Sequence, residues 1–137
     1  MLHSGDYRFS LSGLKTAVIT YINNAKQRHE ELPVADIAAS FQQAVIDVQV
    51  EKSRTALRET GAKVFCLGGG VAANPQLRRA YEEMCAEEGV RLALPPLRSC
   101  GDNAGMIALV AYDRYKQGKF FNIGFDPQAR CNLDEPY

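Results

Sequence analysis

The chain has 137 residues, and its 46% hydrophobic content is sufficient for the core of a single domain. Sixteen basic and sixteen acidic residues cancel, so the net charge gives no overall attraction to nucleic acid or to a membrane surface. No apolar run reaches the length of a membrane span and no signal peptide is visible. The composition therefore predicts a soluble, cytoplasmic protein without a membrane partner, and any nucleic acid would have to meet a local patch.

The cysteines show neither metal-binding nor redox spacing. No C-x-x-C pair is present, and two of the thiols fall where apolar side chains are expected: Cys66 in an apolar run and Cys85 on an apolar helix face. A buried thiol behaves as a small hydrophobic group. We therefore expect reduced cysteines rather than a zinc knuckle or a disulfide framework.

The N-terminal half predicts an arm followed by two helices. Residues 1–12 alternate apolar and polar side chains, which is typical of a short strand or an extended arm. The apolar period then becomes helical over 13–28, with Ser12 as a possible cap. A longer helix is predicted over 33–60, opened by proline and stopped by Gly61. Its apolar residues lie on several faces, so we expect cover on more than one side.

The most informative stretch runs from Val64 to Leu77. Four apolar residues predict a short buried strand, three glycines follow, and Asn74 and Pro75 are typical of the cap and the first residue of a helix. Glycines let a backbone approach a ligand closely, and a helix start offers N–H groups to an anion. The turn is thus a candidate phosphate or acyl-phosphate site, although it also fits plain chain punctuation, and neither common nucleotide fingerprint is present.

A second strand–turn–helix unit follows the first. Residues 90–94 predict a strand that two prolines end. Asp102 then stands at, or within one residue of, the start of a very apolar helix that Gly118 closes. A helix N-cap is the favoured interpretation of Asp102, and a carboxylate presented to a metal or a ligand is the alternative. Residues 119–137 are rich in turn formers and are expected to pack as a tail on the domain.

Two successive strand–helix units predict an α/β fold with a small parallel sheet and packed helices. Both turns would open at the carboxyl edge of the sheet, where α/β folds bind ligands, and this would bring Asp102 toward the glycine turn. The two histidines, His3 and His29, do not belong to this edge. With no metal triad or serine–histidine pair evident, no catalytic residue is assigned.

Three segments resemble successive motifs of a known family: SLSGLKTAV (10–18), CLGGGVAANPQLR (66–78) and LRSCGDNAGMIA (97–108). Their order and spacing are similar to those of the TsaD (YgjD/Gcp, Kae-type) family. The resemblance implies an actin/Hsp70/hexokinase-like (ASKHA) ATPase fold, of which this chain would be the C-terminal lobe. Residues 13–118 would form the lobe, preceded by the 1–12 arm and followed by the 119–137 tail.

The resemblance implies a tRNA N6-adenosine threonylcarbamoyltransferase, an acyltransferase that moves threonylcarbamoyl from threonylcarbamoyl-AMP to N6 of the adenosine beside the anticodon. It implies that Gly69, Gly70 and Asn74 bind the adenylate and that Asp102 is one ligand of a divalent metal, iron or zinc. The histidines of the family's H-x-x-x-H motif are absent from this chain, so the fragment alone is expected to be inactive. Expected partners are tRNA and the accessory proteins of the t6A complex, including a noncatalytic paralogue.

Other interpretations stay open at this point. The chain could be a noncatalytic paralogue or assembly lobe, or the C-terminal lobe of an ASKHA-type sugar or acetate kinase, which shares the glycine turn but is not expected to carry the GDNAG aspartate. The older description of the family as a metal-dependent glycoprotease fits less well, because no general base accompanies the metal. Uncovered apolar surface could also pair two copies of the fragment into a homodimer.

Overall fold

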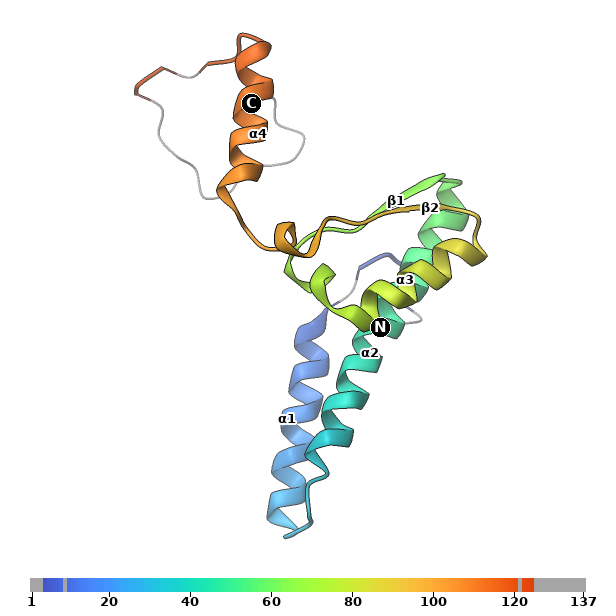
Figure 1. Ribbon diagram of the computed structural model, residues 1–137. Coiled ribbons are helices and arrows are strands. Elements are labelled where there is room, and N and C mark those ends of the chain that lie inside the picture. The colour runs from blue at the N-terminus through green and yellow to red at the C-terminus, as the bar shows by residue number, and fades with distance from the viewer. Residues whose placement is uncertain (1–3, 9, 121, 125–137) are drawn as a thin grey trace. The chain divides into compact units, whose positions relative to one another are not determined.

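The computed structural model describes residues 4–8, 10–120 and 122–124, which fall into two compact units, Met1–Gly101 and Asp102–Tyr137. Figure 1 shows the elements, and each unit is described by itself. The first unit contains, in chain order, α1 (Leu11–Gln27), α2 (Val34–Thr60), β1 (Val64–Cys66), the 3-10 turn η1 (Gly70–Ala73), α3 (Pro75–Glu87), β2 (Arg91–Ala93) and the 3-10 turn η2 (Leu97–Ser99). The second unit contains α4 (Ala104–Lys116).

Helices α1 and α2 pack side by side as a hairpin (Figure 1). Helix α1 begins at Leu11, inside the predicted arm, and Ser10 rather than Ser12 precedes it without a side-chain cap bond. Residues 1–12 were predicted to form a strand or an extended arm, and the described part of 1–10 forms bends and contains no strand. The predicted end of α2 is confirmed, since Gly61 has a φ of 67° and its N–H donates to the Leu57 carbonyl at 2.9 Å.

The two strands form the predicted parallel sheet, with Phe65 opposite Leu92 in the register. Each strand has only three residues, and the prediction that β1 is buried is wrong, because Val64 and Cys66 are exposed. Successive side chains point to opposite faces of a sheet. Phe65 therefore lies on the covered face, where its ring centroid is 5.0 Å from that of Tyr81 in α3.

The core of the first unit lies between α2, α3 and the sheet. The apolar stripe of α3 is buried as predicted, and the buried residues of the core are Ile46, Leu57, Leu77, Tyr81, Met84 and Cys85. Burial raises the pKa of the Cys85 thiol, which agrees with its predicted role as a small hydrophobic group. The prediction that α2 is covered on more than one side is also confirmed, since it contacts both α1 and α3.

Ion pairs join the C-terminal ends of α2 and α3. Arg58 Nη2 lies 2.6 Å from Glu88 Oε1, and Arg54 Nη1 lies 2.9 Å from the same oxygen. Hydrogen bonds from Arg58 and then from Arg54 lower the pKa of the Glu88 carboxyl to about 2.

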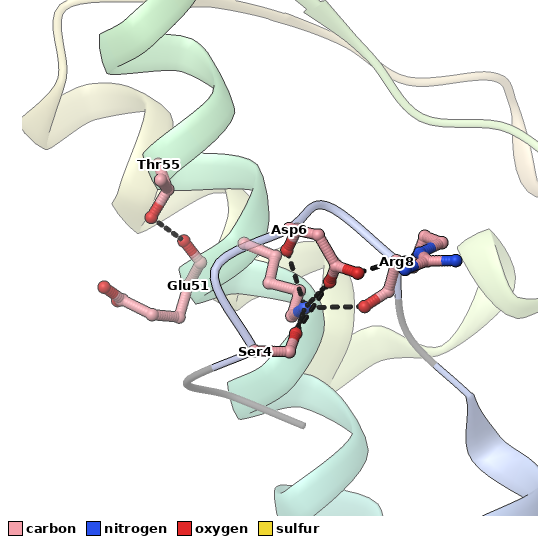
Figure 2. Close-up of polar contacts among 6 residues, drawn as sticks. Ser4, Asp6, Arg8, Glu51 and Thr55 are labelled. Atoms are coloured by element: carbon pink, nitrogen blue, oxygen red, sulfur yellow. Dashed lines mark hydrogen bonds and ion pairs between the residues drawn. The ribbon is translucent and has the colours of Figure 1, made fainter.

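The segment 4–8 is held on α2 by a buried lysine. The Lys52 side chain is 5% exposed, and its ammonium donates to Ser4 Oγ at 2.7 Å, to the Asp6 carbonyl at 2.7 Å and to the Arg8 carbonyl at 2.5 Å. In Figure 2, Ser4, Asp6 and Arg8 lie close together beside α2, and dashed lines mark the hydrogen bonds. Hydrogen bonds from Ser4, Arg8 and Lys52 hold the pKa of the Asp6 carboxyl well below its usual range.

In the second unit, α4 ends as predicted at a left-handed glycine, Gly118, with a φ of 68°. Most of the tail predicted to pack over 119–137, namely residue 121 and residues 125–137, lies outside the described residues, so the tail packing stays a prediction. Among the helices that the structure describes, none combines the length and the apolar character needed to cross a bilayer.

A candidate nucleotide-binding turn

The glycine turn follows β1 at the carboxyl edge of the sheet. Gly69 has a φ of 86° and a ψ of 171°, a backbone region that is essentially restricted to glycine. Gly68 and Gly70 do not have a positive φ. A Cβ built at any of these three positions meets no atom within 4 Å. The glycine turn therefore presents an open backbone surface, as close approach by a ligand requires.

Asn74 caps α3 as predicted, with Pro75 as the first helical residue. Its Oδ1 accepts hydrogen bonds from the N–H of Gln76 at 2.9 Å and of Leu77 at 3.0 Å. Its Nδ2 donates to Gln42 Oε1 of α2 at 2.8 Å, and Gln42 in turn donates to the Gln76 side chain. Since an amide nitrogen carries two hydrogens, one N–H of Asn74 has no partner among the described residues and can serve a ligand.

Arg78 joins the loops that follow the two strands, a role that was not predicted from the sequence. Its Nη1 donates to the Ala72 carbonyl at 2.8 Å and approaches Cys100 Sγ at 3.7 Å, while its Nη2 donates to the Pro95 carbonyl at 3.0 Å. Ala72 belongs to η1, and Pro95 follows β2. These bonds place the two loops side by side, as the parallel sheet predicts. The only signal in the sequence was a basic residue one turn into the helix after the glycines.

Asp102 is exposed and is the first residue of the second unit. The N-cap prediction for it is wrong, because Asn103 caps α4 by accepting from the Met106 N–H at 3.1 Å. A cap must directly precede the first helical residue, and Asp102 stands one position too early. Its carboxylate has no partner among the described residues. Asp102 and Asn74 belong to different units, so their proximity stays a prediction.

The described part of the chain does not form a complete metal site. Within it, no three His, Cys, Asp or Glu side chains gather closely enough to hold an ion. Iron and zinc sites use several such ligands, and zinc usually takes four, counting water or substrate. Asp102 has suitable donor chemistry and an exposed, unpaired carboxylate, but it supplies one ligand only.

Comparison with known proteins identifies the family of this chain. Residues 2–109 match the family described as TsaD: tRNA N6-adenosine threonylcarbamoyltransferase. The chain belongs to the TsaD family. All three motifs of the sequence analysis, at 10–18, 66–78 and 97–108, lie inside the matched residues. The α/β architecture with its small parallel sheet is consistent with that membership.

Curated relatives in the TsaD family match the chain along its length. A relative from Lactobacillus gasseri is 46% identical over 143 residues, and one from Bacillus cereus is 50% identical over 134 residues. A third, from Halalkalibacterium halodurans, is 44% identical over 133 residues. Each of the three is named tRNA N6-adenosine threonylcarbamoyltransferase. The matches cover 97–100% of this chain but 39–40% of the relatives, in their C-terminal portion.

Proposed function

We propose that the chain is the C-terminal, ASKHA-type lobe of a tRNA N6-adenosine threonylcarbamoyltransferase. One observation carries the proposal. In a member of the TsaD family, the open glycine turn leads directly into a helix start whose cap, Asn74, has an amide N–H to offer. A helix N-terminus favours bound anions, and the phosphate of threonylcarbamoyl-AMP is one. The lobe would be inactive without the rest of the protein.

The proposed reaction is acyl transfer. N6 of the adenosine attacks the carbamoyl carbonyl carbon, the bond from that carbon to the phosphate oxygen breaks, AMP leaves and N6 loses a proton. Gly69 and Gly70 would let the backbone approach the adenylate, and Asn74 would donate its remaining amide hydrogen to it. Holding the leaving group in this way contributes by proximity rather than by proton transfer. We assign no catalytic residue to the chain.

We further propose that Asp102 supplies one carboxylate ligand to an iron or zinc ion, completed by histidines outside this chain. The proposal is supported by the different roles of the two polar residues that precede α4. Asn103 forms the cap, so the exposed Asp102 carboxylate is available for another partner. The described residues do not hold a metal by themselves.

The proposed partners are tRNA as acceptor and the accessory proteins of the t6A complex, among them a noncatalytic paralogue. Several relatives carry the transferase name, which favours the catalytic member over an assembly lobe.

Asn74 allows a test that separates nucleotide binding from folding. The complete protein containing this chain should transfer threonylcarbamoyl to tRNA, and calorimetry should detect AMP binding. Asn74→Ser keeps a good cap but loses the hydrogen bond to Gln42, so the free energy of unfolding should fall by about 1 kcal/mol. It loses the amide donor, so AMP affinity and t6A yield should fall.

Asn74→Ala serves as the comparison, because it removes both the amide donor and the cap. Loss of the cap should lower the free energy of unfolding by about 1 kcal/mol. AMP affinity of Asn74→Ser equal to that of the unaltered protein would confine Asn74 to capping. A complete protein that transfers no threonylcarbamoyl would overturn the proposed function in favour of a noncatalytic paralogue.

A further inference from the structure

At the carboxyl edge of the sheet, the guanidinium of Arg78 bridges the two loops that follow the strands. Both loops that leave the strands turn a backbone carbonyl toward Arg78, from Ala72 on the glycine-turn side and from Pro95 on the other. The buried Cys100 thiol completes the set, since it lies 3.7 Å from Arg78 Nη1 and 3.6 Å from the Pro96 carbonyl. All of these residues belong to the first unit.

The chemistry of arginine suits this arrangement. A guanidinium is planar and always charged, and its N–H groups form a rigid fork that fixes the separation of two acceptors. No described carboxylate pairs with Arg78, so its charge is balanced only by carbonyl dipoles and the thiol. The positive charge consequently lies beside η1, the turn that follows the glycines, where it favours an approaching anion.

We propose that Arg78 is a positioning residue, which sets the glycine turn and the loop after β2 in the arrangement that binds the adenylate. This inference rests on the proposed function. Without Arg78, two carbonyls lose their donor and the loops can separate. The binding-competent arrangement then becomes a minor state, and apparent affinity falls in proportion to its population.

The test uses the complete protein with three substitutions. Arg78→Met removes the charge and the donors but keeps a long side chain. Arg78→Lys keeps the charge without the fork. Arg79→Met is the matched control, because Arg79 is the exposed neighbour on α3 and has no partner among the described residues. The readouts are kcat, separate KM values for threonylcarbamoyl-AMP and tRNA, and hydrogen exchange of the two loops.

Arg78→Met should raise KM for threonylcarbamoyl-AMP about tenfold and leave KM for tRNA unchanged. Hydrogen exchange should accelerate over 68–74 and 94–100 and stay unchanged in α2. For Arg78→Lys, both KM for threonylcarbamoyl-AMP and the exchange rates of the two loops should lie between those of Arg78→Met and those of the unaltered protein. For Arg79→Met, both should equal those of the unaltered protein. A purely structural role would lower stability without separating the two KM values. If Arg78→Met does not fold, Arg78→Lys carries the same comparison.

Unchanged exchange and an unchanged KM for threonylcarbamoyl-AMP in Arg78→Met would overturn the inference while the proposed function stands. A complete protein without transferase activity would overturn the proposed function, and with it the adenylate part of the inference. In that case hydrogen exchange alone still decides whether Arg78 holds the two loops.

Discussion

The Lys52 ammonium lies 3.1 Å from the Asp6 carboxylate, although the two residues are 46 positions apart in the chain. The lysine is buried in α2, whereas the side chain of Asp6 is 32% exposed. Around this pair, Ser4 and Arg8 supply further oxygen acceptors. Segment 4–8 is thus attached to α2 by one buried cation with several oxygen acceptors, and by the Tyr7 hydroxyl, which donates to Glu59.

Lys52→Met should lower the free energy of unfolding by about 1–3 kcal/mol, because it leaves several oxygens without their donor. Methionine has a similar length, so the decrease in the free energy of unfolding measures the loss of the ammonium hydrogen bonds rather than a loss of packing. Urea denaturation measures the change. Lys63→Met, at an exposed position with no side-chain partner among the described residues, should have almost no effect. Equal stability of the two variants would show that the ammonium does not anchor the segment.

The Glu88 bridge predicts a pH dependence. The pKa of the Glu88 carboxyl is lowered from 4.5 to about 2 in the folded chain, chiefly by the hydrogen bond from Arg58. A lowered folded-state pKa means that the unfolded chain binds the proton first as acid is added. The stability contributed by the bridge is therefore present above about pH 4.5 and is lost as the pH falls toward 2.

Denaturation at several pH values between 2 and 6 should reveal this loss, and Glu88→Gln should reduce the slope. Glu83→Gln removes an exposed carboxylate of α3 that has no partner among the described residues, and it should keep the slope. Identical slopes for Glu88→Gln and the unaltered chain would contradict the role of the bridge.

The two predicted glycine contacts can be separated by alanine substitution. Gly69→Ala should lower the free energy of unfolding by roughly 1–3 kcal/mol, because its backbone lies in a region that alanine avoids. Gly70→Ala should fold at least as well as glycine, since its φ is not positive and a methyl group meets open space. That methyl would project from the open turn, so AMP affinity should fall. If Gly70→Ala binds AMP normally, Gly70 does not contact the nucleotide.

Asp102 and Asn103 form a matched pair at the start of α4. Asn103→Ala should lower the free energy of unfolding by about 1 kcal/mol, because it removes the cap. Asp102→Ala should change stability by less than about 0.5 kcal/mol. In the complete protein, Asp102→Ala should instead reduce bound iron or zinc, which elemental analysis measures. Normal metal content together with full tRNA modification in that variant would reject the ligand role.

Local signals predicted local structure well. Gly61 ends α2 because only glycine adopts a left-handed cap without strain, and Asn74 with Pro75 starts α3 for equally local reasons. The parallel pairing also followed from the order of strand and helix patterns. The glycine turn was located correctly, although which glycine needs a positive φ was not evident before the backbone was seen.

Features that depend on distant partners could not be predicted. Val64 and Cys66 look like core residues in the sequence, but their burial depends on what covers the second face of the sheet. The roles of Arg78 and Lys52 depend on acceptors brought by other loops. At α4, two adjacent polar residues both suit a cap, and a shift of one position in the helix start decided between them.

A sheet of two three-residue strands has an unpaired outer side on each strand in the described part of the chain. Backbone groups along such an edge accept another strand readily. The match to the Lactobacillus gasseri relative covers 40% of that relative's length. Produced alone, the chain would expose these strand edges to its own copies, and its tendency to self-associate would report how readily the open edges pair.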